Sequence, residues 1–527
     1  KGAWTLMRTR NVYRPAAMLF LAAGIVLLSG CQETPEESAV VSRAEGLSED
    51  AAAEPLKEGE TQTIELPAKW EETKKWNDDR WIFQTDMVLE PIETGNLPVV
   101  EMEPYAISQE ELEKLTAYFA DGRELYVPKP DSREDYQKKL NRIQNMEGVY
   151  SVYTIDVLLS EETRMLREGL ELATPEAELT DQKTEVRFGP RELDPAEAAM
   201  YKDYYSDEIE TYDRDLYFSA DVGENRESHI TARKYDPDTG KTSSFEWIAG
   251  DELLLQKNDI DRYKSNHSPY ADASETDKKW EELLDRCTAM MTEENIDEKT
   301  GQVKAEALLA ELGIDGKIYA YSEPALWFPS GTYEEDIAFS YSDSLWNADL
   351  SQAESGYVYT FLNEVGGLPV DVQYGGGTWG TGEGESEAYA PAISVETVSV
   401  AVTRSGIKMF SWTGMAKEVS VVAENVKIQD FEKIQERIRQ YISYCFPGNQ
   451  PVDSTAVFYY ELEEMSFGYT YIPAYENPDH VWAVPAWFLE FRNYHEEPEL
   501  DGGKEEKAAS WLSLTFNAMD GGVVKAG

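Results

Sequence analysis

The last strand-like segment of the chain has the strictest pattern in the sequence, an alternation of apolar and polar side chains over residues 512–518. The apolar members are Leu512, Leu514, Phe516 and Ala518, and the polar members are Ser513, Thr515 and Asn517. Such alternation turns one face of a strand toward a core and the other toward water, which is typical of an antiparallel sheet. A strand of this kind needs partner strands and a covering layer, so its neighbours in the chain constrain the fold.

Those neighbours predict one helix and two more strands. Residues 428–442 place apolar side chains along one helical face, and residues 458–471 and 481–492 are rich in aromatic and β-branched side chains. We therefore expect residues 426–527 to form a C-terminal module, a helix on an antiparallel sheet, that folds on its own. Pro485, inside the middle strand, predicts an edge or a bulge there.

The same order of elements precedes this module. A helix is expected at residues 304–312, followed by strands at 317–327, 357–365 and 395–402. Residues 301–425 are thus predicted to form a first helix-plus-antiparallel-sheet module, in tandem with the C-terminal one. The predicted fold class is α+β.

Residues 63–300 mix helix and strand patterns and are predicted to form an N-terminal α+β region. The clearest helix signal is at residues 108–120, where Ser108 and Glu111 have the spacing of a capping box. Further elements are expected as helices at 132–145, 161–172, 195–204 and 274–291 and as strands at 81–90, 97–102 and 216–235.

The N-terminal residues have the layout of a secretory signal peptide. Arg8, Arg10 and Arg14 form a positive segment, residues 16–28 are apolar, and small residues lead up to Cys31. The apolar stretch is shorter than the roughly 20 residues that a membrane-spanning helix needs. We expect Met7 to be the start and residues 7–30 to be removed.

Residues 28–31, Leu-Ser-Gly-Cys, resemble a bacterial lipobox. The resemblance implies that Cys31 becomes the first residue of the mature chain and carries a diacylglyceryl group. Two acyl chains are the usual minimum for stable anchoring. Cys31 is therefore the predicted lipidation site, and the expected location is the outer face of the cell membrane, lipid-anchored and extracytoplasmic.

Charge restricts the partners of the body that follows Cys31. The chain has a formal net charge of -53, and removal of the four cations before Cys31 makes the mature charge -57. Such a body repels nucleic acid and anionic lipid, so we exclude nucleic acid as a partner. Residues 32–62 contain nine acidic and two basic residues and little that is large and apolar, so residues 31–62 are predicted to be a disordered, flexible acidic stalk.

No residue pattern in the sequence predicts a catalytic, cofactor-binding or metal site. The four histidines, His229, His267, His480 and His495, are isolated from one another and from cysteine, and H-E-x-x-H is absent. The glycines of residues 375–380 precede an acidic run that does not open a phosphate-binding helix. Ser405-Gly-Ile-Lys408 and Lys299-Thr-Gly301 occur in the wrong order for penicillin-recognising enzymes and are expected at turns.

The two cysteines after Cys31 leave two alternatives open. Cys287 and Cys445 could pair, or both could be buried thiols. Two cysteines in an exported chain of this length do not make a disulfide framework.

Two stretches carry a family resemblance. Residues 484–487, Val-Pro-Ala-Trp, followed by residues 514–524 resemble the last two strands of PepSY-like and cystatin-like modules, which also occur in membrane-tethered extracytoplasmic regulators of a cell-wall-sensing histidine kinase. From the lipobox through residues 97–101 and 110–115 to the C-terminus, the chain is similar to a family of uncharacterised lipoproteins of Clostridia-type Gram-positive bacteria. The resemblance implies cystatin/PepSY-like modules and a location, and it supplies no catalytic residue.

These observations favour a non-enzymatic lipoprotein that binds or regulates another component of the cell envelope, with a protein partner as one possibility. The alternatives are a glycan-active enzyme that uses two carboxylates and a solute-binding lipoprotein. For the first hypothesis, we expect the contact surface at an exposed strand edge or near Pro485.

Overall fold

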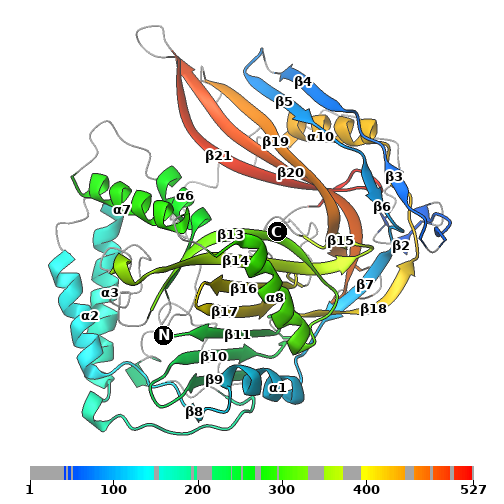
Figure 1. The fold of residues 1–527 in the computed structure, drawn as a ribbon. Coiled ribbons are helices and arrows are strands. Elements are labelled where there is room, and N and C mark those ends of the chain that lie inside the picture. Colours follow the sequence, from blue (N-terminus) through cyan, green and yellow to red (C-terminus); the bar gives the residue numbers. More distant parts are fainter. Residues whose placement is uncertain are drawn as a thin grey trace, which may run out of the picture.

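Two sheets, one of ten strands and one of eight, form the body of the protein, and helices pack on both (Figure 1). This computed structural model describes residues 41–42, 46–48, 51–57, 59–76, 78–146, 153–190, 195–196, 198, 216–238, 240–250, 253–266, 275–292, 296–329, 349–371, 393–445, 456–474, 477, 479–498 and 504–524. The predicted α+β class is confirmed. Cys31 and the expected signal peptide lie outside these residues. In the ranges described, no helix is long and apolar enough to cross a membrane.

The ten-stranded sheet, called the large sheet below, is built of antiparallel pairs. Its strands in spatial order are β12 (Leu253–Gln256), β13 (Lys317–Phe328), β14 (Glu354–Val365), β16 (Thr397–Thr403), β17 (Gly406–Thr413), β11 (Ser244–Ala249), β10 (Ser228–Arg233), β9 (Tyr217–Val222) and β8 (Leu125–Tyr126), with β15 (Leu368–Pro369) beside β14. The sequence predicted β13, β14 and β16 close to these bounds. It did not predict that strands from residues 125–249 would extend the same sheet.

The eight-stranded sheet, called the small sheet, joins the two ends of the chain. Its strands in spatial order are β18 (Ala416–Ala423), β7 (Val99–Pro104), β20 (Val481–Pro498), β19 (Val457–Pro473), β5 (Trp81–Val88) and β4 (Lys69–Trp76), with β21 (Lys504–Asn517) beside β20 and β22 (Val523–Val524) beside β21. β19 and β5 run parallel. Two short pairs, β1 (Val41–Ser42) with β2 (Gly46–Leu47) and β3 (Gln62–Ile64) with β6 (Ile92–Thr94), lie apart from it.

Two helices cover one face of the large sheet. α1 (Gln109–Ala120) begins at the predicted capping box, where the Ser108 side chain accepts from the Glu111 N–H and the Glu111 side chain accepts from the Ser108 N–H. α8 (Glu298–Leu312) approaches so closely that a Cβ added at Gly301 would collide with the Tyr359 hydroxyl. Apolar residues of both helices share one buried cluster with the sheet.

The remaining helices form three groups. α7 (Glu275–Thr292) packs on β13 beside α6 (Lys257–Asn266), and it buries Cys287 in a cluster with Leu326 and Phe328. α2 (Arg133–Met146) and α3 (Tyr153–Leu172) pack on each other. α10 (Phe431–Cys445) packs on the small sheet. The side chain of Cys445 lies outside the described residues, as does most of the helix predicted at 195–204.

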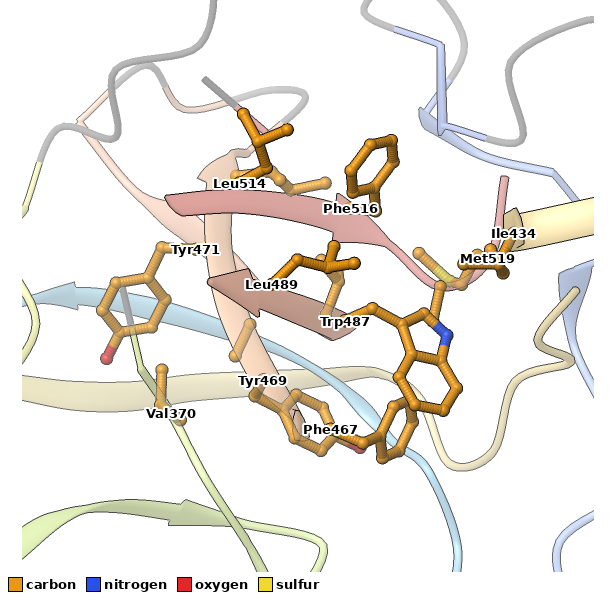
Figure 2. Packing of buried hydrophobic residues seen from close by; sticks show 14 of the residues in the cluster. Val370, Ile434, Phe467, Tyr469, Tyr471, Trp487, Leu489, Leu514, Phe516 and Met519 are labelled. Atoms are coloured by element: carbon orange, nitrogen blue, oxygen red, sulfur yellow. The ribbon is translucent and has the colours of Figure 1, made fainter. Parts of the chain in front are cut away.

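The core of the small sheet is formed by large aromatic side chains (Figure 2). Trp487 is 1% exposed and lies near Phe467 of β19, while Phe516 of β21 is fully buried on the same side. Ile434 of α10 closes this core from the helix side. Each such side chain stabilises the fold by about 1.5–3 kcal/mol through burial alone. β21 turns Leu514 and Phe516 into this core, as the alternation at residues 512–518 predicts. The expectation that its other face meets water is wrong, because Thr515 and Asn517 are buried as well.

The predicted module boundaries do not coincide with the sheets. Within the predicted C-terminal module, β19 pairs with β5 over residues 81–85, and β20 pairs with β7 over residues 100–102. The predicted first module also loses β18, which follows β17 in the chain but pairs with β7 of the small sheet. The periodicity of a strand shows which residues face a core, whereas partner choice depends on contacts distant in sequence, and this is why the tandem interpretation failed.

Part of the predicted flexible stalk is docked on the body. Ala51 is 5% exposed and Ala52 forms a bridge with Val426. Asn425 donates to the Glu54 carbonyl at 3.1 Å, and the Leu56 N–H donates to the Asn96 side chain at 2.7 Å. Backbone hydrogen bonds to the body replace the apolar burial that this acidic segment lacks. The stalk prediction is therefore wrong for residues 51–57, and residues 31–40 lie outside the described part.

Pro485 is neither at a sheet edge nor at a bulge, because β20 lies inside the small sheet. On one side, Pro485 pairs with Tyr469 of β19. On the other side, β20 changes partner: its pairing with β7 stops at Ala483 of β20, and its pairing with β21 starts at Ala486 of β20. The residues between these partners need not donate on that side, which suits a residue without an N–H. The carbonyl of Pro485 accepts from the Ala518 N–H at 2.9 Å.

A buried polar network joins the two sheets. Lys317 of β13 lies 3.1 Å from Glu396, and their side chains are 8% and 2% exposed. Lys317 also donates to Asn363 at 2.8 Å, and Asn363 donates to the hydroxyl of Tyr471 in the small sheet at 3.3 Å. Burial raises the pKa of Tyr471, so its hydroxyl keeps its proton. One continuous set of polar contacts thus runs from the large sheet into the small one.

Glu396 receives further bonds from the segment that crosses between the sheets. Trp412 Nε1 donates to it at 2.6 Å, and the N–H of Ala416, at the start of β18, donates at 3.4 Å. Gly414 lies between them at φ 68°, and a Cβ there would meet the Val395 carbonyl. Only glycine fits this crossing without strain.

We predict that residues 426–527 expressed alone show no cooperative thermal transition, because β19 and β20 would lose β5 and β7. A chain of residues 46–527 is the matched control and should unfold cooperatively. Circular dichroism during heating measures both. A sharp transition in the isolated 426–527 fragment would contradict this result and restore the tandem-module interpretation.

Candidate functional site

A cavity of about 470 Å³ opens at one end of the large sheet. The end of β13, the start of β14, the turn between β16 and β17, and α7 surround it. Its lining residues are Met290, Leu326, Ala353, Glu354, Ser355, Arg404 and Ser405. An apolar floor with a few converging polar groups, in this size range, is the usual form of a small-ligand site.

Glu354 is the polar centre of this cavity. Its Oε2 accepts hydrogen bonds from Thr403 at 2.7 Å and Ser405 at 2.5 Å, and its Oε1 lies 3.5 Å from Lys408. Burial favours the neutral carboxyl, but the hydroxyl bonds and the Lys408 charge outweigh it and lower the pKa of Glu354. The cavity therefore presents a fixed carboxylate beside a lysine.

Lys408 is held in place by an aromatic ring as well. Its Nζ lies 3.7 Å from the centroid of the Trp327 ring, a cation–π contact. Trp327 is 8% exposed, and its Nε1 is buried without a hydrogen-bond partner among the described residues. The lysine is thus positioned before any ligand arrives, which reduces the entropy lost on binding.

One residue of the cavity, Ser405, belongs to the Ser405-Gly-Ile-Lys408 pattern, to which the sequence analysis assigned no function. Ser405 and Lys408 meet on Glu354, and the turn expected at residues 405–406 is confirmed by the hairpin between β16 and β17. Lys299-Thr-Gly301, by contrast, lies in the first turn of α8, not at a loop turn. Asp297 caps this helix, which begins at Glu298, six residues before the predicted start at residue 304, and ends at Leu312 as predicted.

The histidines that look isolated in the sequence have close partners in the fold. His229 Nδ1 lies 2.8 Å from Asp221, and its Nε2 lies 3.3 Å from Ser219. His495 stacks on Phe458 with ring centroids 5.4 Å apart. His267 lies outside the described residues. Within the described ranges, no group of three or more histidine, cysteine or acidic side chains has the geometry of a metal site.

His480 sits between two glutamates of β7. Its Nδ1 lies 2.7 Å from Glu101 and its Nε2 lies 3.3 Å from Glu103. Asn477 donates to Glu101 at 3.0 Å, and the bonds from Asn477 and His480 lower the pKa of Glu101. This cluster fixes the loop between β19 and β20 on β7.

Two carboxylates are direct neighbours on adjacent strands of the small sheet. Glu464 of β19 is the register partner of Glu490 of β20, and Ser513 donates to Glu490. Burial raises the pKa of Glu490, and the nearby charges of Glu464 and Asp371 raise it further. Four tryptophans of the small sheet, Trp70, Trp81, Trp482 and Trp487, are buried in its core and so offer no exposed ring to a sugar.

The glycines of residues 375–380 and Cys31, the predicted lipidation site, lie outside the described residues. The sequence analysis named none of the cavity residues as functional, because the lining comes from segments between residues 290 and 405. The single available signal was the pair Ser405 and Lys408.

Comparisons with known proteins supply no function for this chain. No protein-family model matches the chain, and no curated protein matches it. The chain is similar to an uncharacterized protein from Eubacterium rectale, with 10% sequence identity and a TM-score of 0.41, over 88% of this chain and 94% of that one. A likeness at this TM-score carries no argument about activity.

Proposed function

We propose that the protein is a membrane-anchored extracytoplasmic lipoprotein that binds a component of the cell envelope at the cavity around Glu354. The anchor is the diacylated Cys31 of the lipobox-like segment. The observation that supports binding is the cavity of about 470 Å³, into which the Glu354 carboxylate is held by Thr403 and Ser405, with Lys408 behind it on the Trp327 ring.

The cavity chemistry defines the class of ligand. Glu354, Ser355, Arg404 and Ser405 offer both donors and acceptors, while Met290, Leu326 and Ala353 offer an apolar floor. Such a surface suits a small ligand, or the end of a larger one, that carries several polar groups on a compact apolar frame. The overall charge of -53 favours ligands and partners that are neutral or basic, with an association rate that falls as salt is added.

The edge near Pro485 is no longer part of this proposal. Ala486 is fully buried in a strand that is paired on both sides, so a charge placed there would unfold the core. Solute-binding lipoproteins are also not favoured, because the described sheets contain the parallel pair of β19 and β5 but no repeated parallel strands linked by helices.

A second candidate function is hydrolysis of a glycan by two carboxylates. The observation that favours it is Glu490, whose raised pKa suits a general acid, directly opposite Glu464. Glycan turnover that is lost in Glu490→Gln and kept in Ala353→Trp would promote this candidate above ligand binding.

We predict that Ala353→Trp, which fills the cavity, abolishes saturable binding of a small envelope component. Isothermal titration calorimetry with a panel of muropeptides, N-acetylated sugars and short basic peptides measures this. At least one ligand should bind the wild type with a Kd below about 1 mM and lose roughly tenfold or more in affinity. Lys433→Ala, in a separate hollow of about 270 Å³ on α10, is the matched control and should bind as the wild type does.

Two outcomes would contradict the binding proposal. One is binding that survives Ala353→Trp, which would place the ligand elsewhere. The other is the absence of binding to every member of the panel at millimolar concentration by a wild type that is shown to be folded.

The anchor is tested separately. We predict that the wild type stays with the membrane fraction after a high-salt wash and that Cys31→Ala moves it to the soluble fraction, because the lipid is the expected attachment. Cys287→Ala is the control, since that thiol is buried in the α7 cluster. A Cys31→Ala chain that remains on washed membranes would contradict lipid anchoring.

A further inference from the structure

The hairpin of β9 and β10 places a serine, a histidine and an aspartate in contact on one face of the large sheet. Phe218, Ala220 and Val222 of β9 point into the core under α1 and α8. Ser219 and Asp221 alternate with them and so point to the opposite face. His229 is the register partner of Asp221 and therefore lies on that same face.

The contacts run in a single line through the imidazole. Ser219 Oγ lies 3.3 Å from His229 Nε2, and His229 Nδ1 lies 2.8 Å from Asp221 Oδ1. The Asp221 carboxyl is 8% exposed and the imidazole 31% exposed. A buried carboxylate thus holds a more accessible histidine, which in turn reaches a hydroxyl.

A cation holds the carboxylate end of this line. Arg226, in the turn between the two strands, places its Nε 3.5 Å from Asp221 Oδ2. Arg226 also lies 3.7 Å from Asp181, and it adopts a left-handed backbone at φ 53°. A positive neighbour favours the ionised form of Asp221. Ionised Asp221 accepts the Nδ1 proton of a neutral His229, which leaves Nε2 free to accept the Ser219 proton.

We propose that Ser219, His229 and Asp221 form a nucleophile, general base and positioning residue for hydrolysis of carboxylic esters. Ser219 Oγ attacks the ester carbonyl carbon while His229 Nε2 takes the hydroxyl proton. The carbonyl oxygen becomes an oxyanion as the bond to Ser219 Oγ forms. The C–O bond to the alcohol then breaks, and His229 gives its proton to the leaving alkoxide.

Water completes the reaction by the same groups. His229 takes a proton from water, the hydroxide attacks the acyl–Ser219 carbonyl, and the bond to Ser219 Oγ breaks as that oxygen regains the proton. The products are a carboxylic acid and an alcohol, and no further reactant is consumed. This site lies on the β9–β10 hairpin and does not depend on the cavity around Glu354.

The sequence analysis expected no catalytic residue and did not single out the contact of Ser219, His229 and Asp221. No short motif contains the three residues, because they come from two strands on either side of a turn. The hairpin register alone brings them together. The same row of the sheet also contains Ser411, which donates to Glu246 at 3.1 Å with no histidine beside it. Ser411 therefore offers a matched serine in similar surroundings.

The direct test is reaction of the full chain with a fluorophosphonate probe, which labels serines that a base activates. We expect labelling of Ser219, located by peptide mass spectrometry, and none in Ser219→Ala. His229→Gln should lower the labelling rate by roughly 100-fold or more, the contribution of a general base. Ser411→Ala should react as the wild type does.

The role of Asp221 is tested by the pH profile of the labelling rate, which a purely structural role of this residue would leave unchanged. The labelling rate of the wild type should rise with pH as His229 loses its proton, and Asp221→Asn should lower the plateau of that profile while its far-ultraviolet circular dichroism is unchanged. Hydrolysis of p-nitrophenyl acetate provides the second measurement. No labelling of Ser219 in folded wild type, or equal rates in wild type and His229→Gln, would overturn the proposal and leave these residues as a cross-strand polar contact.

Discussion

The buried pair of Lys317 and Glu396 is the interaction on which the arrangement of the two sheets depends. Neither charge tolerates burial alone, because an unpaired buried ion is destabilising by several kcal/mol. Asn363, Tyr471, Trp412 and the N–H of Ala416 supply the remaining hydrogen bonds. These partners come from both sheets and from the crossing between them, so the pair is satisfied in one relative placement only.

That placement explains why the body is one unit and not a tandem array. The chain enters the small sheet with β4, β5 and β7, builds most of the large sheet, and returns through β18 to finish the small sheet with β19, β20 and β21. Residues 51–57 then dock beside Val426, which follows β18 and donates to the Leu97 carbonyl just before β7. Both candidate sites lie on the large sheet, the cavity at its β13–β14 end and the ester site on the β9–β10 hairpin.

The sequence predicts local structure well and long-range pairing poorly. The apolar face of residues 512–518, the apolar face of α10 and the capping box of α1 are local signals, and the structure confirms each one. β19 and β20 also pair with β5 and β7, which lie more than 370 residues away, a distance over which periodicity carries no information. The prediction of an edge or bulge at Pro485 was wrong for the same reason. A proline fits wherever a strand residue need not donate an N–H, and this holds both at an edge and where an interior strand changes partner.

The candidate sites follow the same division. Ser219-x-Asp221 and His229 become visible once the hairpin register across the turn is counted, so this site was within reach of sequence reasoning. The cavity was not, because α7, β13, β14 and the β16–β17 turn converge only after the sheet has formed. The lipobox-like segment ending at Cys31 differs from the cavity, because all of its residues are contiguous and the motif can be recognised without a structure.

A double-mutant cycle on Lys317→Met and Glu396→Gln tests the central claim most directly. Urea unfolding gives the free energy of each variant. We predict a loss of about 3–5 kcal/mol for each single change, because each leaves a buried partner unsatisfied, and a much smaller loss than their sum for the double variant. Losses that add to within about 0.5 kcal/mol would show that the two residues act independently and would contradict the account.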